Sequence, residues 1–161
     1  MFSGCAIDFL VKPLSVAEVE DIAELRLALI SLALKPAYRH VSPADFDNAY
    51  DLAKRINRTR NAKDIFEYNR QFWGTIFSKA QRPVLWEVFR QLDDRMRRYD
   101  AFFLKVFPTP ETRPRQRETL IEIYRKGKIV EAFQACKKLY LTVVDGLIDH
   151  LTSHEADGPT R

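Results

Sequence analysis

The chain has 161 residues, of which 46% are hydrophobic, 12% are aromatic, 30% are charged and only five are glycines. This composition fits one globular domain with a buried core, and it excludes collagen-like, low-complexity and disordered chains. The formal net charge of +4 is the difference between 26 basic and 22 acidic residues interleaved along the sequence, an excess too weak to indicate nucleic-acid binding.

No uninterrupted apolar run approaches the roughly 20 residues that a membrane-spanning helix needs. The mostly apolar stretch 6–11 has neither a basic leader nor a small-residue cleavage site. Two cysteines, Cys5 and Cys136, are too few for a disulfide framework or a four-ligand zinc site, so we expect reduced thiols. We therefore predict a cytoplasmic protein with no membrane partner.

Eight prolines divide the chain into segments with a helical period of apolar residues. The first predicted helix begins at Ser15, where Ser15 and Glu18 fit a capping box, and runs towards Pro36. Its predicted apolar face consists of Ile22, Leu25, Leu29 and Leu32. The second helix follows Ser42, with a proline in its first turn, and its stripe consists of Phe46, Tyr50 and Ala53.

Four further helices are predicted over about 62–80, 84–106, 114–126 and 129–151. The 84–106 helix is predicted to be long, with a stripe of Leu85, Val88, Leu92, Met96, Tyr99, Phe103 and Val106. Gly127 is well placed to end the predicted helix 114–126. These segments predict an all-α fold, a single antiparallel bundle of about six helices. Residues 1–13 form a lead, 14–152 the helical domain and 153–161 a polar tail.

Motifs of catalysis are missing from the sequence. It contains no phosphate-binding glycine loop, no nucleophile elbow and no Cys-x-x-Cys pair. His150 and His154 are four residues apart, but no third histidine is near them in sequence, so a specific histidine metal site is not expected. We predict that the protein is not an enzyme.

Three stretches follow one another in a distinctive order and spacing. The first contains Leu14-Ser15, Glu18 and Glu24-Leu25-Arg26; the second is Asn69-Arg70-Gln71-Phe72-Trp73, with Arg82-Pro83 after it; the third runs from Arg117 to Ala132. From about Leu14 to Leu151 the chain therefore resembles the FCD domain, the effector-binding C-terminal domain of GntR-type transcription regulators.

Many members of that family bind a metal ion through one Asp and three His, and the ion holds a small carboxylate effector. The resemblance places Asn69, Trp73, Arg117 and Leu139 at those four positions. None of these side chains is a good metal ligand. We therefore expect no metal cofactor at this centre.

Arg117 is the informative residue of this set, because a buried guanidinium needs a partner. That partner is either a protein carboxylate (Glu67, Asp93 or Asp94) or the carboxylate of a ligand. We hypothesise that Arg117, helped by Arg95 or Tyr99, replaces the metal and binds an acidic or acyl effector. In the alternative, Trp73 fills the space and Arg117 reaches solvent.

The resemblance also implies a homodimer, and it implies that DNA is bound only through a winged helix-turn-helix domain, which this chain lacks ahead of Leu14. We predict an effector-binding and dimerisation domain that senses a small organic acid or acyl compound. The alternative is a structural module that binds no ligand and serves to dimerise or to bind another protein.

Overall fold

The structure, a computed structural model, describes residues 13–156. This range contains no strand, and its helices are α1 (Val16–Tyr38), α2 (Pro43–Arg58), α3 (Ala62–Phe77), η1 (Ser78–Ala80), α4 (Pro83–Met96), η2 (Arg97–Tyr99), α5 (Asp100–Val106), α6 (Gln116–Arg125) and α7 (Ile129–Ala156). The prediction of an all-α bundle is confirmed. Residues 1–12 of the predicted lead and residues 157–161 of the predicted tail lie outside the described range.

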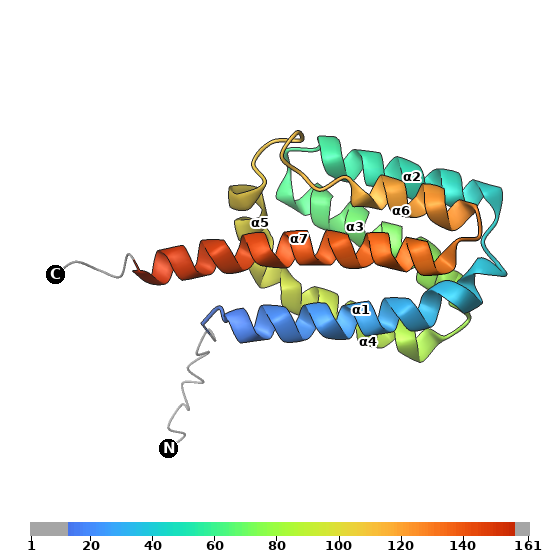
Figure 1. Ribbon diagram of the computed structural model, residues 1–161, viewed down its shortest axis with the longest axis horizontal. Coiled ribbons are helices and arrows are strands. Elements are labelled where there is room, and N and C mark those ends of the chain that lie inside the picture. The colour runs from blue at the N-terminus through green and yellow to red at the C-terminus, as the bar shows by residue number, and fades with distance from the viewer. Residues whose placement is uncertain (1–12, 157–161) are drawn as a thin grey trace, which may run out of the picture.

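The long helices α1 and α7 lie side by side and run in opposite directions (Figure 1). Helix α4 packs against α1, while α6 packs against both α7 and α2, and α2 packs against α3. The two described ends of the chain lie at the same end of the bundle (Figure 1). No helix among residues 13–156 combines the length and apolar character needed to span a bilayer.

Only one of the two hydrogen bonds of the predicted capping box forms at the start of α1. The Ser15 Oγ accepts a hydrogen bond from the Glu18 backbone N–H at 3.3 Å. The Glu18 carboxylate does not return to the Ser15 backbone; instead the Tyr99 hydroxyl lies between them, accepting from the Ser15 N–H at 3.2 Å and donating to Glu18 Oε2 at 2.7 Å. A residue 84 positions away in sequence thus completes the cap.

The predicted apolar face of α1 is partly wrong. The side of α1 that meets the core contains Val19, Ile22, Ala23, Arg26, Ile30, Ala33, Leu34 and Ala37. Leu25 and Leu32 are instead 53% and 50% exposed. Apolar residues occupy nearly the whole circumference of this helix, so their period alone does not select the buried side. Pro36 also lies inside α1 rather than at its end.

The predicted helix 84–106 is divided into α4, η2 and α5. Helix α4 buries Leu85, Phe89 and Asp93 at intervals of one turn, and Val88 is 40% exposed. In a continuous α helix, Tyr99 would lie about 240° around from Asp93 and leave the core. The tighter turn of η2 and the change of direction into α5 bring Tyr99 to 1% exposure (Figure 1).

Gly127 ends α6 as predicted. Its φ of +75° lies in the left-handed region that favours glycine. The Gly127 N–H donates to the Tyr124 carbonyl at 2.9 Å, and the Lys128 N–H donates to the Ile123 carbonyl at 3.4 Å, which is a Schellman ending. Helix α7 follows at once and continues to Ala156, past the predicted start of the tail at 153.

Buried aromatic rings fill the core between α3, α4 and α7. Trp73 is in edge-to-face contact with Phe72 at 5.0 Å and in tilted contact with Phe89 and Tyr140 at 5.9 and 6.4 Å between ring centroids. Such contacts add to the stabilisation that comes from burying the rings. This aromatic layer forms one boundary of the polar centre described next.

Candidate functional site

Two adjoining cavities, of about 80 and about 60 Å³, lie in the bundle. Both are lined by Arg26, Asn69, Met96, Arg117 and Val143, which come from α1, α3, α4, α6 and α7. A single water needs about 10–15 Å³ of cavity volume, so each cavity has room for several waters or a small molecule. Because the shared lining residues come from five helices, the shape of both cavities depends on the packing of the whole bundle.

Arg26 and Asp93 form a buried ion pair in the wall of the larger cavity. The Arg26 Nη2 lies 2.8 Å from Asp93 Oδ1, and the two residues are 7% and 3% exposed. The Arg26 guanidinium also lies over the rings of Phe89 and Tyr140, at 4.9 and 5.1 Å from their centroids. Burial lowers the pKa of Arg26, but attraction to Tyr140 and Asp93 outweighs it and raises that pKa above its ordinary value. The charge of Arg26 is thus compensated within the protein.

Arg117 is buried without such compensation. Its Nε and Nη2 both donate to the side-chain oxygen of Asn69, at 3.2 and 3.0 Å. Its Nη1 has no hydrogen-bond partner among the described residues, although Arg117 is only 8% exposed. Burial lowers the pKa of Arg117 to about 10, and repulsion from Arg26 acts in the same direction. An amide dipole is a weak partner for a buried cation, so among the described residues this guanidinium lacks the carboxylate partner that a buried charge ordinarily has.

Tyr140 supplies a second free donor to the smaller cavity. Its hydroxyl is buried and has no hydrogen-bond partner in the described part of the chain, and Tyr140 lines this cavity together with Arg117. Burial raises the pKa of Tyr140, so the hydroxyl stays protonated and able to donate. An unsatisfied buried donor destabilises the protein by about 1–3 kcal/mol. Arg26 Nε, which also lacks a hydrogen-bond partner among the described residues, belongs to a third residue of this cavity, and such donors fit a ligand that accepts hydrogen bonds, for example a carboxylate.

Asp100 places a carboxyl group on the larger cavity. It is the first residue of α5, and its side chain makes no hydrogen bond or ion pair within residues 13–156. Burial raises the pKa of Asp100 to about 7, and repulsion from Asp93 adds to this, against the opposite effects of Arg97 and Arg26. The larger cavity therefore carries a free acidic group as well as Arg117.

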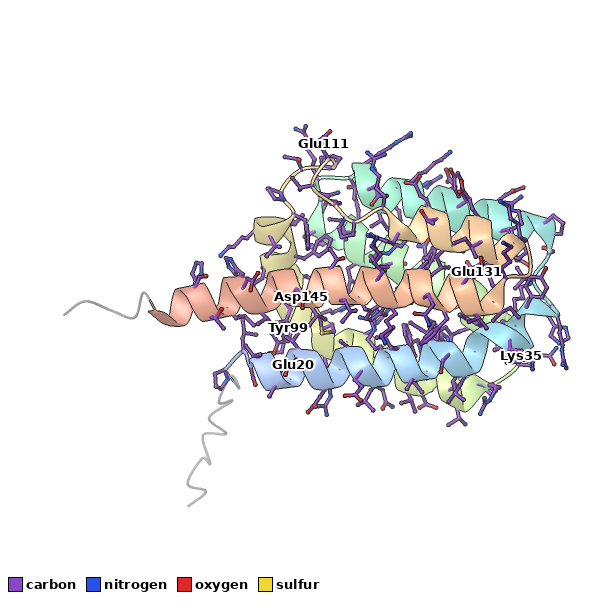
Figure 2. All side chains as sticks on the ribbon, viewed as in Figure 1. Glu20, Lys35, Tyr99, Glu111, Glu131 and Asp145 are labelled. Atoms are coloured by element: carbon purple, nitrogen blue, oxygen red, sulfur yellow. The ribbon has the colours of Figure 1, made fainter. Side chains whose placement is uncertain are left out.

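The structure brings three of the predicted site residues together. Asn69, Arg117 and Tyr99 line the larger cavity. Figure 2 shows Tyr99 beside the first turns of α1, where its hydroxyl meets Glu18. Trp73 and Leu139 are 1% exposed and lie in the core without lining either cavity, and Arg95 is exposed on the surface.

None of the three protein carboxylates considered as partners for Arg117 meets it. Asp93 pairs with Arg26, Asp94 pairs with Arg70, and Glu67 accepts a hydrogen bond from Gln71. The alternative in which Arg117 reaches solvent also differs from the structure, because the side chain is buried. Arg117 is thus buried, and its Nη1 has no hydrogen-bond acceptor among the described residues.

Arg26, Asp100 and Tyr140 were not predicted from the sequence as site residues, and Asp93 was considered only as a partner of Arg117. Both members of the Arg26–Asp93 pair carried a signal in the sequence. Arg26 follows the buried Ile22 by four residues, and Asp93 follows the buried Phe89 by four, so each places a charge in an apolar stripe of its helix. A charged residue in such a stripe requires a partner, and these two supply each other.

The residues at the family's metal positions do not fit a metal ion. Asn69, Trp73, Arg117 and Leu139 offer one amide oxygen, which already accepts two hydrogen bonds from Arg117. The buried guanidinium beside that oxygen would repel a cation. Within the described residues, no group of three or more His, Cys, Asp or Glu side chains gathers in a metal-binding arrangement.

Comparison with known proteins gives one family and one fold. A family model described as the FCD domain matches residues 21–140. The crystal structure of a transcriptional regulator (GntR family member) from Pseudomonas syringae pv. tomato str. DC3000 is similar, with a TM-score of 0.78 and 18% sequence identity over 91% of this chain. The match spans 62% of that regulator's chain. No curated protein sequence gives a significant match.

Proposed function

The chain belongs to the FCD domain family, and we propose that it is an effector-binding domain of a GntR-type transcription regulator in which Arg117 takes the place of a metal ion. The observation that carries the proposal is the pair of free buried donors, Arg117 Nη1 and the Tyr140 hydroxyl, on one cavity. The effector is a small organic acid or acyl compound whose carboxylate accepts from both.

The surroundings of Arg117 support an anion rather than a neutral ligand. Asn69 holds the guanidinium through Nε and Nη2 and leaves Nη1 for the ligand. Arg26 lies on the same cavity, and the described residues that line this cavity include no carboxylate. A charge-assisted hydrogen bond to a carboxylate is about twice as strong as one between neutral groups. No acid, base and nucleophile converge on this site, and the proposed role is regulatory and non-enzymatic.

A ligand here would act by changing the arrangement of helices. The cavity walls come from α1, α3, α4, α6 and α7, so a ligand that binds one arrangement more tightly shifts the population towards it. In a regulator of this type, that shift changes the position of an attached winged helix-turn-helix domain and so its contact with DNA.

A thermal-shift screen of small carboxylates, sugar acids and acyl compounds, with and without a chelator, tests the proposal. A ligand present at about 100 times its dissociation constant adds about 2.7 kcal/mol of stability and raises the melting temperature by several degrees. The expected result is a carboxylate that stabilises the protein equally in chelator. The Arg117→Gln variant should lose this shift.

Arg115→Gln is the matched control, because Arg115 is an exposed arginine at the start of the same helix. It should keep the full shift. Loss of the shift in chelator would contradict the metal-free site, and an Arg117→Gln variant that binds as well as the wild type would remove the role of Arg117. A broad panel without any stabilising compound would favour the structural alternative.

We also propose that the domain forms a homodimer through the outer face of α1 and α4. On that face, Leu25 and Leu32 of α1 and Val84 and Val88 of α4 are 40–70% exposed. A groove lined by Leu29, Val84 and Val88 joins the two helices. Exposed residues of both signs, Glu24 and Glu87 with Arg82 and Arg90, belong to the same two helices or their ends. A face with an apolar centre and charges of both signs is suited to pair with its own copy.

A further inference from the structure

The larger cavity is lined by two groups of opposite charge, the buried Arg117 and the partly buried Asp100, that have no ion-pair partner among residues 13–156. Arg117 has a free Nη1, and Asp100 has a carboxyl group without a hydrogen bond or ion pair in residues 13–156. Both residues line this cavity. The other two charged residues on its wall, Arg26 and Asp93, are already joined, with 2.8 Å between Nη2 and Oδ1. A ligand that satisfies the cavity therefore needs a group for each free charge.

We propose that the effector is a small zwitterion, whose carboxylate binds Arg117 and whose ammonium group binds Asp100. This inference rests on the proposed function, because it assigns the second half of the same ligand. An ammonium group offers three donors and a positive charge, which is the complement of a carboxylate in a partly buried site. A plain carboxylate would bind Arg117 and leave Asp100 without a partner.

The wall of the cavity favours an apolar spacer between the two charged groups. Met96 and Val143 line both cavities, and Phe103, Leu104 and Leu147 line the larger one. These side chains offer no hydrogen bonds to a polar middle section. An unbranched amino acid with its ammonium and carboxylate groups at opposite ends of a short methylene chain has this pattern.

Asp93 is not an equal candidate for the ammonium group. It is 3% exposed, and its Oδ1 is bound to Arg26, while its Oδ2 lies 4.0 Å from Arg70 Nε. A second cation there would have to compete with both guanidinium groups. Asp100 has Arg26 and Arg97 only as more distant charges, whose effect on it is weaker than that of burial.

Isothermal titration calorimetry with matched pairs of probes tests the proposal. Each pair consists of an amino acid and the acid of the same length without the amino group: β-alanine with propanoate, γ-aminobutyrate with butanoate, and δ-aminovalerate with valerate. In the wild-type protein, at least one amino acid should bind about tenfold or more tightly than its partner acid, as expected for a charge-assisted hydrogen bond.

The Asp100→Asn variant should abolish this preference, so that each amino acid binds no more tightly than its partner acid. Asp94→Asn, at an exposed carboxylate of α4, is the control and should keep the preference. Equal or tighter binding of the plain acids to the wild type would overturn the zwitterion and leave the carboxylate site of Arg117 standing. No binding of any probe by the wild type, in both members of every pair, would contradict the zwitterion as well as the acid-binding function.

Discussion

The Nη2 atom of Arg26 lies 2.8 Å from Oδ1 of Asp93, in a pair that joins α1 to α4 inside the bundle. Arg117, at the same cavities, meets only an amide oxygen among the described side chains. Two buried arginines in different states thus line the same cavities. Arg26 is paired with a carboxylate across two helices, and Arg117 is the ligand-binding residue that we propose.

Replacing Asp93 by Asn should destabilise the domain by about 3–5 kcal/mol, because it leaves the Arg26 charge buried and unpaired. Chemical denaturation near neutral pH measures the loss. Asp94→Asn is the control: this neighbouring residue pairs with Arg70 but is 56% exposed, so its loss should cost about 0–1 kcal/mol. Equal effects of the two substitutions would mean that the Arg26–Asp93 pair has no structural role.

Tyr99→Phe should loosen the start of α1. The Tyr99 hydroxyl bonds both the Ser15 N–H and the Glu18 carboxylate, so its removal breaks the cap and should cost about 1–2 kcal/mol. Amide hydrogen exchange should also speed up in the first turn of α1. Tyr68→Phe, at a partly buried tyrosine of α3, should change stability by less than about 0.5 kcal/mol. Unchanged exchange at α1 in Tyr99→Phe would show that Ser15 alone suffices as the cap.

Asp100 should make stability fall as the pH rises from about 4 to about 7. Its pKa is about 7 in the folded protein against an ordinary value of 3.8, so the folded state binds more protons in this window. The Asp100→Asn variant lacks this loss and should be more stable than the wild type by about 1–2 kcal/mol above pH 7, allowing for solvent screening. The difference should vanish near pH 4. Urea midpoints across this range measure it, and parallel pH profiles of the two proteins would contradict the buried carboxyl group.

The helices could be predicted from the sequence because their signals are local. Ser42 and Pro43 start α2, and Gly127 ends α6, through contacts within a few residues. Which side of α1 faces the core could not be predicted, because apolar residues lie on nearly all sides of this helix. The break at η2 depends on Tyr99 reaching Ser15 and Glu18, a contact between distant parts of the chain.

The candidate site was predictable in part for the same reason. Arg117 stood out because a charge replaced a ligand position of the family, and Asn69 stood out at another. Tyr140 and Asp100 lack such a signal, because a tyrosine in an apolar stripe and an acidic residue near a helix start are common features. Only the packing of the helices shows that Asp100 lines the larger cavity and that Tyr140 lines the smaller one.

If the proposed homodimer forms, the mass of the protein in solution should depend on its concentration, and a substitution in the interface should shift that dependence. Leu32→Glu places a charge on the proposed interface and should raise the dimer dissociation constant by about tenfold or more. Val130→Glu is the control, because Val130 is 74% exposed on α7, away from the groove. Analytical ultracentrifugation measures both. A monomeric wild type at tens of micromolar, or equal disruption by Val130→Glu, would remove this face as the interface.

The same substitution at Arg26 and Arg117, the two buried arginines that line both cavities, should act in opposite directions. Arg117→Met replaces a cation that lacks a carboxylate partner by an apolar side chain, and it should stabilise the ligand-free domain by about 1–2 kcal/mol. It should also abolish carboxylate binding, which identifies the buried charge as a functional group kept at the expense of stability. Arg26→Met leaves Asp93 buried and unpaired, and should destabilise the domain by about 3–5 kcal/mol. Denaturation of both variants without ligand decides the matter: if Arg117→Met is as destabilising as Arg26→Met, Arg117 is a structural residue, and the cavity is not built around a free positive charge.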